Sequence, residues 1–148
     1  MSHDKPLESI YLASESAMQD YASELVHLIA PGDVVYFEGN LGAGKTTLIR
    51  AMLRLLGHTG PVNSPTYTLI ETYQFDDYDV HHFDLYRLES ADELEATGAR
   101  DLFDGRNICL IEWPYRAEGF VPDADVQVSI EHEVVGRRVS LLVNKTIA

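Results

Sequence analysis

One short segment constrains the fold of this chain most. Residues 39–46 read Gly-Asn-Leu-Gly-Ala-Gly-Lys-Thr and match the pattern G-x-x-x-x-G-K-[ST]. The preceding Val34-Val35-Tyr36-Phe37 consists of β-favouring residues, and residues 47–53 have the composition of a helix. A strand, a glycine-rich turn and a helix N-terminus direct free backbone N–H groups at one point. The sequence therefore predicts a phosphate-binding loop between a strand and a helix.

The side chains of this segment have expected places around a nucleoside triphosphate. Lys45 can reach the β- and γ-phosphates, and the Thr46 hydroxyl can bind Mg²⁺. The alternative is a flexible turn with a surface lysine, which the flanking strand and helix disfavour. We therefore expect ATP or ADP, together with Mg²⁺, as ligands. The residues expected to contact the nucleotide here are Asn40, Leu41, Gly42, Ala43, Gly44, Lys45, Thr46 and Thr47.

Size and charge limit the classes of function. The 148 residues fit a single domain over 1–148, with residues 1–8 expected to be flexible. The net charge of −13 lacks the dense basic face of nucleic-acid binders, so strong direct binding to nucleic acid is not expected. No apolar stretch approaches the roughly 20 residues that span a bilayer, and the polar residues 1–6 lack the apolar core of a signal peptide. We therefore expect a cytoplasmic protein that does not enter membranes.

The remaining elements follow from turn residues and apolar periodicity. The pattern predicts a strand near 10–12, followed by a helix that is capped by Ser14 or Ser16 and ended by Pro31-Gly32. Gly57 is expected to end the helix after the loop, and a further helix should run from a capping box at 90–93 to about Thr97. The other predicted strands cover 66–75, 79–86 and 107–112, and two more lie near 125–133 and 137–143. Helices and strands alternate early, and hairpins come later. We therefore predict an α/β, P-loop NTPase-like three-layer fold with a mixed central sheet flanked by helices.

The single cysteine, Cys109, lies in an apolar strand and is expected to be buried and inert.

Two carboxylates are candidates for the metal that such a loop requires. Glu112 closes the apolar run Ile108-Cys109-Leu110-Ile111, and Asp84 follows Val80-His81-His82-Phe83. A phosphate-binding enzyme needs a carboxylate at the end of a neighbouring strand to hold Mg²⁺ or its waters. Each could instead be an ordinary surface carboxylate at a strand end. We expect both at the metal, with Glu112 closer to the metal or to the attacking water.

Thr66 and Trp113 complete the predicted site. Thr66, in Ser64-Pro65-Thr66-Tyr67, could meet Mg²⁺ and the γ-phosphate as a switch loop does, or simply begin a proline-stiffened strand. Trp113 follows Glu112 and is expected near the nucleotide, although it could serve only in packing. The expected catalytic residues are thus Lys45, Thr66, Asp84 and Glu112. His81 and His82 do not suggest a zinc site, because neighbours on a strand point to opposite faces.

The sequence favours ATP and hydrolysis over other nucleotide chemistry. The guanine-reading N-K-x-D motif is missing, because Asn144-Lys145-Thr146-Ile147 lacks the aspartate, and no D-x-x-G motif occurs. A small-molecule kinase would need a lid that supplies arginines, but residues 91–106 contain only Arg100 and Arg106 among acidic residues. A regulatory ATPase therefore fits better than a kinase. A nucleotide-binding subunit without hydrolysis is the third possibility.

Four motifs in order resemble one known family. They are the loop through Thr47, then Ser64-Pro65-Thr66-Tyr67, His82-Phe83-Asp84-Leu85-Tyr86-Arg87-Leu88, and Ile111-Glu112-Trp113. Together they closely resemble the TsaE (YjeE) family, over about residues 10–143. Asn40 stands where the family often has aspartate.

The resemblance implies a role in tRNA N6-threonylcarbamoyladenosine synthesis. It implies a mixed-sheet P-loop fold and an ATPase that is slow alone and acts with TsaD and TsaB, resetting their complex between turnovers. The tRNA would be left to those partners, in keeping with the negative charge. By resemblance, Thr46, Asp84 and Glu112 serve Mg²⁺, Lys45 the phosphates, and Thr66 the switch, while Trp113 lies near the nucleotide.

Overall fold

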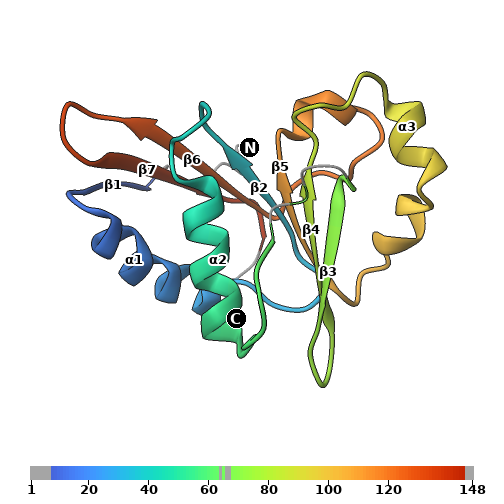
Figure 1. Cartoon of the computed structure of the whole chain (residues 1–148), viewed down its shortest axis with the longest axis horizontal. Helices are drawn as coiled ribbons and strands as arrows, with labels where there is room; N and C mark the ends of the chain where they lie inside the picture. The colour runs from blue at the N-terminus through green and yellow to red at the C-terminus, as the bar shows by residue number, and fades with distance from the viewer. Residues whose placement is uncertain (1–7, 64, 66–67, 146–148) are drawn as a thin grey trace.

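The computed structural model describes residues 8–63, 65 and 68–145 (Figure 1). Its strands are β1 (Glu8–Leu12), β2 (Val34–Glu38), β3 (Ile70–Gln74), β4 (Asp79–Asp84), β5 (Ile108–Glu112), β6 (Val126–His132) and β7 (Arg137–Val143). Its helices are α1 (Glu15–Leu28), α2 (Lys45–Leu56) and α3 (Ala91–Ala96), with 3₁₀ turns η1 (Ala99–Leu102) and η2 (Pro114–Ala117). Of the N-terminal segment predicted to be flexible, residues 1–7 lie outside the described residues, and Glu8 begins β1.

The strands form one mixed sheet in the order β1-β7-β6-β2-β5-β4-β3. The four central strands β6, β2, β5 and β4 are mutually parallel, whereas β7, β1 and β3 pair antiparallel with their neighbours. The parallel strands place their carboxyl ends at one edge of the sheet. Strand β2 leads there into the glycine-rich loop, and β4 and β5 end there with their carboxylates.

Helices cover both faces of this sheet, as Figure 1 shows. Each face of the sheet has its own apolar core, and successive side chains of β5 point into one core and then the other. Ile108 and Leu110 pack with α1 and α2, whereas Cys109 and Ile111 pack with α3 and the 3₁₀ turns. Apolar residues on both faces of a strand are typical of a central parallel strand. The predicted three-layer α/β fold is confirmed. No helix among the described residues has both the length and the apolar character needed to cross a bilayer.

Local signals explain where the two long helices begin and end. Ser14 caps α1, because its side chain accepts a hydrogen bond from the Ala17 N–H at 3.1 Å. Helix α2 ends at Gly57, whose φ of 114° lies in the left-handed region that glycine adopts readily. Of the two capping residues that the sequence allowed for α1, the structure therefore selects Ser14.

Strands β3 and β4, which form a hairpin at one edge of the sheet, are shorter than the predicted 66–75 and 79–86. Residues 66 and 67 lie outside the described residues, and Leu69 has a φ of 67°, which breaks the extended backbone before β3 begins. Strand β4 ends at Asp84, because the Tyr86 N–H turns back onto Asp84 Oδ1 at 3.1 Å. This turn keeps the Asp84 carboxylate at the sheet edge.

Helix α3 forms as predicted, but its capping box does not. The Ser90 side chain makes no capping hydrogen bond. The Glu93 carboxylate accepts instead from the Glu89 N–H at 3.0 Å, one residue earlier than the box requires. Thr97 follows the last helical residue, as expected.

Candidate functional site

The glycine-rich loop connects β2 to α2 in a conformation that depends on its glycines. Gly39, Gly42 and Gly44 have φ values of 149°, 79° and 113°, all on the positive side that disfavours side chains. A Cβ on Gly39 would lie only 2.5 Å from the Ile130 carbonyl oxygen of β6. Gly44 is the N-cap of α2 and offers no side chain to its first N–H groups. These N–H groups therefore suit an anion at the helix N-terminus.

Arg137 at the start of β7 supports this loop from the side. Its guanidinium donates to the Ala43 carbonyl at 3.0 Å, to the Gly42 carbonyl at 3.4 Å and to its neighbour Gly136 at 2.9 Å. It adds positive charge beside a phosphate-type loop in an acidic chain. No pattern in the sequence indicates this role of Arg137, because the contact joins segments far apart in the chain and belongs to no motif.

Lys45 lies inside the loop and is only 5% exposed. Its Nζ donates to the carbonyls of Gly39 and Asn40, the latter at 3.1 Å, and lies 4.5 Å from the centre of the Trp113 ring. Burial lowers the pKa of Lys45, while the charges of Glu112 and Asp84 act in the opposite direction. The amine is thus held in a protected position near two carboxylates, where a phosphate could replace the loop carbonyls as its partner.

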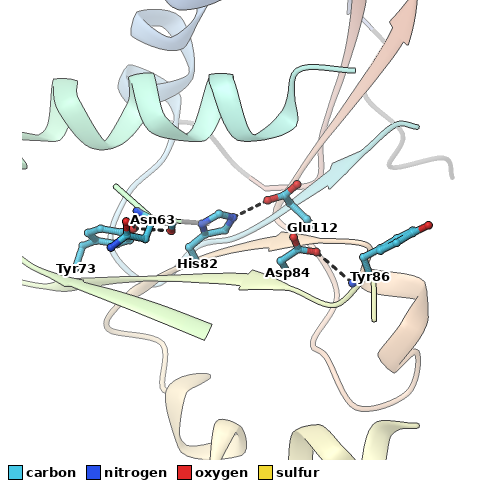
Figure 2. Close-up of polar contacts among 6 residues, drawn as sticks. All are labelled: Asn63, Tyr73, His82, Asp84, Tyr86 and Glu112. Carbon is cyan, nitrogen blue, oxygen red and sulfur yellow. Dashed lines mark hydrogen bonds and ion pairs between the residues drawn. The ribbon is translucent and has the colours of Figure 1, made fainter. Parts of the chain in front are cut away.

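Asp84 and Glu112 end neighbouring parallel strands and are register partners (Figure 2). Burial raises the pKa of Asp84, the Glu112 charge adds to this effect, and the Tyr86 N–H partly offsets it. Glu112 itself is 2% exposed. Asp84 is half-buried, and the two neighbouring carboxylates repel each other, so a cation between or beside them would be stabilised.

His82 is a member of this cluster that the sequence interpretation missed. Its Nε2 lies 2.7 Å from Glu112 Oε2, and both side chains are buried (Figure 2). His81 points to the other face, where its Nδ1 lies 2.8 Å from Thr72 Oγ1. The signal was the spacing: His82 stands two residues before Asp84, which places both side chains on one face of β4.

Trp113 follows Glu112 at the same edge of the sheet. It has a φ of 59°, unusual for a bulky residue, and its ring packs 4.9 Å from the Tyr86 ring as well as under Lys45. The structure therefore places the indole beside the loop lysine. Its proximity to a nucleotide stays a prediction.

The other predicted residues lie around the same loop, with one outside the described part. Thr46 and Thr47 are half-buried in the first turn of α2, and Asn40 and Leu41 are exposed on the loop. Thr66 lies outside the described residues. Just before it, Asn63 is tied to β3, since the Tyr73 hydroxyl donates to the Asn63 carbonyl at 3.2 Å (Figure 2).

A cavity of about 220 Å³ adjoins the loop. It lies between the start of α1, the loop and the start of β7, and its lining includes Ser14, Met18, Gly44, Thr47, Gly136 and Arg137. The cavity touches the helix N-terminus on one side. It therefore offers space for the rest of a ligand whose phosphates occupy the loop.

The donor set suits Mg²⁺ shared with phosphates. Thr46, Asp84 and Glu112 supply a hydroxyl and carboxylates, the hard oxygen ligands that Mg²⁺ prefers. The described residues contain no group of three or more His, Cys, Asp or Glu side chains placed to hold a metal by themselves. Mg²⁺ is usually bound by one or two carboxylates together with phosphates and water.

A parallel strand, a glycine-rich loop, a helix N-terminus and strand-end carboxylates define the P-loop class of α/β proteins. Within that class the chain belongs to the TsaE family, because residues 12–139 match the family model described as threonylcarbamoyl adenosine biosynthesis protein TsaE. The following relatives show the extent of the similarity.

Two relatives and one solved structure are similar to this chain over most of its length. The tRNA threonylcarbamoyladenosine biosynthesis protein TsaE of Haemophilus influenzae is 50% identical over 109 residues, covering 74% of this chain and 69% of the relative. The Bacillus subtilis protein of the same name is 43% identical over 101 residues, covering 68% of this chain and 63% of the relative. The crystal structure of Bacillus subtilis YdiB superposes with a TM-score of 0.80 at 26% identity, covering 98% and 90% of the two chains.

Proposed function

We propose that this chain serves tRNA N6-threonylcarbamoyladenosine biosynthesis as a Mg²⁺-dependent ATPase that acts on a complex of TsaD and TsaB in the cytoplasm. The family membership supports the pathway. The observation that carries the enzymatic part is the position of Lys45, which lies in a glycine-rich loop under the electrostatic influence of both Asp84 and Glu112.

Each part of the site has a role in this proposal. The N–H groups at the start of α2 and the Lys45 amine bind the phosphates of ATP, and Thr46 and Asp84 take part in holding Mg²⁺. Bound Mg²⁺ would neutralise charge that develops on the phosphates. Glu112 orients the attacking water or a metal-bound water. Arg137 stabilises the conformation of the loop by donating hydrogen bonds to the carbonyl oxygens of Gly42 and Ala43.

No observation favours the alternative of a small-molecule kinase. Arg100, one of two arginines in the segment that would serve as a lid, pairs with Glu95 at 2.7 Å and stacks over Phe120 at 4.7 Å. Arg106 precedes β5, so it stands at the opposite end of that strand from Glu112. These positions do not support the arginine-bearing lid that a kinase would need, and we propose water as the acceptor.

The charge of the chain supports action through protein partners. A net charge of −13 opposes tight binding to tRNA. A protein of this kind can instead report its nucleotide state to TsaD and TsaB and reset their complex between turnovers. The tRNA then contacts the partners, and strong direct binding by this chain is not part of the proposal.

ATP and GTP turnover with Mg²⁺, measured alone and with TsaD and TsaB present, tests the proposal. We expect slow hydrolysis of ATP alone, marked stimulation by the partners, and little turnover of GTP. The turnover of the Lys45→Ala variant, measured in the same conditions, defines the background rate. Turnover that stays at this background in both conditions contradicts the ATPase assignment, and turnover without any effect of the partners contradicts their role.

A further inference from the structure

A buried hydrogen bond fixes one oxygen of Glu112. His82 Nε2 lies 2.7 Å from Glu112 Oε2, and the two residues are 1% and 2% exposed. An ionised carboxylate only accepts hydrogen bonds, so with Glu112 ionised we assign the ring proton of His82 to Nε2. Low exposure strengthens such a bond, because water does not compete for either group.

This bond constrains the orientation of the carboxylate. Glu112 has rotatable side-chain bonds, and its backbone is fixed by pairing of β5 with both β2 and β4. With Oε2 held by His82, the remaining oxygen is the one available to a ligand at the sheet edge. Figure 2 shows His82 and Asp84 as two side chains of β4 that both approach Glu112.

We infer that His82 is a positioning residue, which holds Oε2 of Glu112 so that the other oxygen meets the attacking or metal-bound water. This inference rests on the proposed ATPase function. His82 does not touch the nucleotide in this scheme. Its effect passes through Glu112, in the way that outer residues orient the groups that hold a metal or its water.

The adjacent histidine provides a matched control. His81 is also buried, at 3% exposure, and also makes one side-chain contact, with Thr72. It lies on the opposite face of the same strand, away from Glu112. A purely structural role for a buried histidine in β4 would therefore make substitutions at 81 and 82 equivalent in their effect on turnover.

The test compares His82→Leu, His82→Gln and His82→Asn with His81→Leu. A glutamine amide nitrogen can take the place of Nε2, whereas the shorter asparagine cannot reach Glu112 from the same backbone. We expect His82→Leu and His82→Asn to lower kcat by about 10- to 100-fold with KM for ATP changed less than about threefold. His82→Gln should recover most of kcat, and His81→Leu should retain it. Thermal unfolding of every variant identifies those that fail to fold.

A second readout does not depend on turnover. In the ¹⁵N spectrum of histidine-labelled protein without nucleotide, His82 Nε2 should be protonated, with its signal identified by its loss in His82→Gln. An unprotonated Nε2 overturns the inference, since no donor would then hold Glu112.

The outcomes for turnover separate the inference from the proposed function. Folded His82→Leu with the kcat of the wild type, or the same loss in His81→Leu, overturns the positioning role and leaves the ATPase function intact. Wild-type turnover no faster than that of Lys45→Ala overturns the ATPase function itself, and the role of His82 with it.

Discussion

Asp84 and Glu112 face each other across two neighbouring parallel strands as register partners at the edge where both strands end. The charge of Glu112 is a cause of the raised pKa of Asp84, after burial. Repulsion between the buried Glu112 carboxylate and the half-buried Asp84 carboxylate is unfavourable unless a cation or hydrogen-bond donor offsets it. The Lys45 amine, which is attracted to both carboxylates, and the His82 ring, which contacts Glu112, can offset this repulsion. Both groups belong to the candidate site and not to the apolar core.

Substitution of Glu112 should separate catalysis from binding. Glu112→Gln keeps an oxygen for His82 but loses the negative charge, so we expect kcat for ATP to fall by about 100-fold or more. The dissociation constant for ADP should change by less than about threefold, because the phosphates bind the loop and Lys45. Turnover assays and calorimetry provide the two values, with the exposed Glu131→Gln as control. Equal losses in turnover and affinity point to a structural role.

Lys45→Ala should remove most turnover without harming the fold. The substitution deletes the cation of the loop, and we expect kcat/KM to fall by roughly 100-fold or more. Burial lowers the pKa of Lys45, so the charged amine is less favourable in the folded chain than in the unfolded one. Removal of Lys45 also removes its attraction to Glu112 and Asp84, which acts in the opposite direction, so the melting temperature should change little. Arg106→Ala, an exposed cation at the far end of β5, serves as control, and normal turnover by Lys45→Ala would refute the assignment.

Trp113 offers an optical signal. It is the single tryptophan of the chain, and Lys45 Nζ lies 4.5 Å from the centre of its ring. If Lys45 moves to phosphates on binding, the charge above the indole changes, and so should its fluorescence. We expect a saturable change on addition of ADP and Mg²⁺. A flat titration, with binding shown independently by calorimetry, would mean that Lys45 and the indole keep their contact.

Gly39 is more crowded than Gly105 and has a φ less accessible to a residue with a side chain, so substitution by alanine should cost more at Gly39. Gly39 and Gly105 have φ values of 149° and 74°, but a Cβ meets the Ile130 carbonyl at 2.5 Å only in the first case and has open space in the second. Gly105→Ala should cost about 1–2 kcal/mol of stability. Gly39→Ala should cost at least about 2 kcal/mol more, because backbone must shift. Thermal unfolding of both variants measures the two losses of stability. Equal losses would show that β6 tolerates the added methyl group at Gly39.

Cys109 should be unreactive in the folded protein. Burial raises the pKa of its thiol from 9.0 to about 12. The thiolate is the reactive form, so a disulfide reagent at pH 8 should label Cys109 slowly in the native state and fast in guanidinium chloride. The raised pKa also stabilises the fold below pH 9, and this contribution should be lost as the pH rises from 9 toward 12. Fast labelling of native protein would indicate that the strand opens locally.

The sequence predicted most features of the fold that depend on local chemistry, although the capping box predicted at 90–93 does not form. The loop from Gly39 and the end of α2 at Gly57 follow from residue types at fixed spacings, and Ser14 was one of the two caps that the sequence allowed for α1. The strand limits were less accurate, because short local turns that the alternation of apolar residues does not reveal decide them. The end of β4, for example, depends on the Tyr86 N–H turning back onto Asp84.

For the site, sequence indicated the residues but few of their contacts. The order of strands, with β5 between β2 and β4, is what makes Asp84 and Glu112 neighbours, and no local pattern specifies it. Arg137 escaped notice for the same reason, since it reaches the loop from the other end of the chain. His82 could have been found from its spacing to Asp84. Thr66 lies outside the described residues, so its role as a switch stays a prediction.

Calorimetric titration of the folded protein with ADP and ATP in the presence of Mg²⁺ tests the central claim most directly. The loop, Lys45 and the strand-end carboxylates predict saturable binding of one nucleotide per chain, weakened when Mg²⁺ is removed and lost in Lys45→Ala. No heat of binding for either nucleotide, with the fold confirmed by circular dichroism, would contradict it.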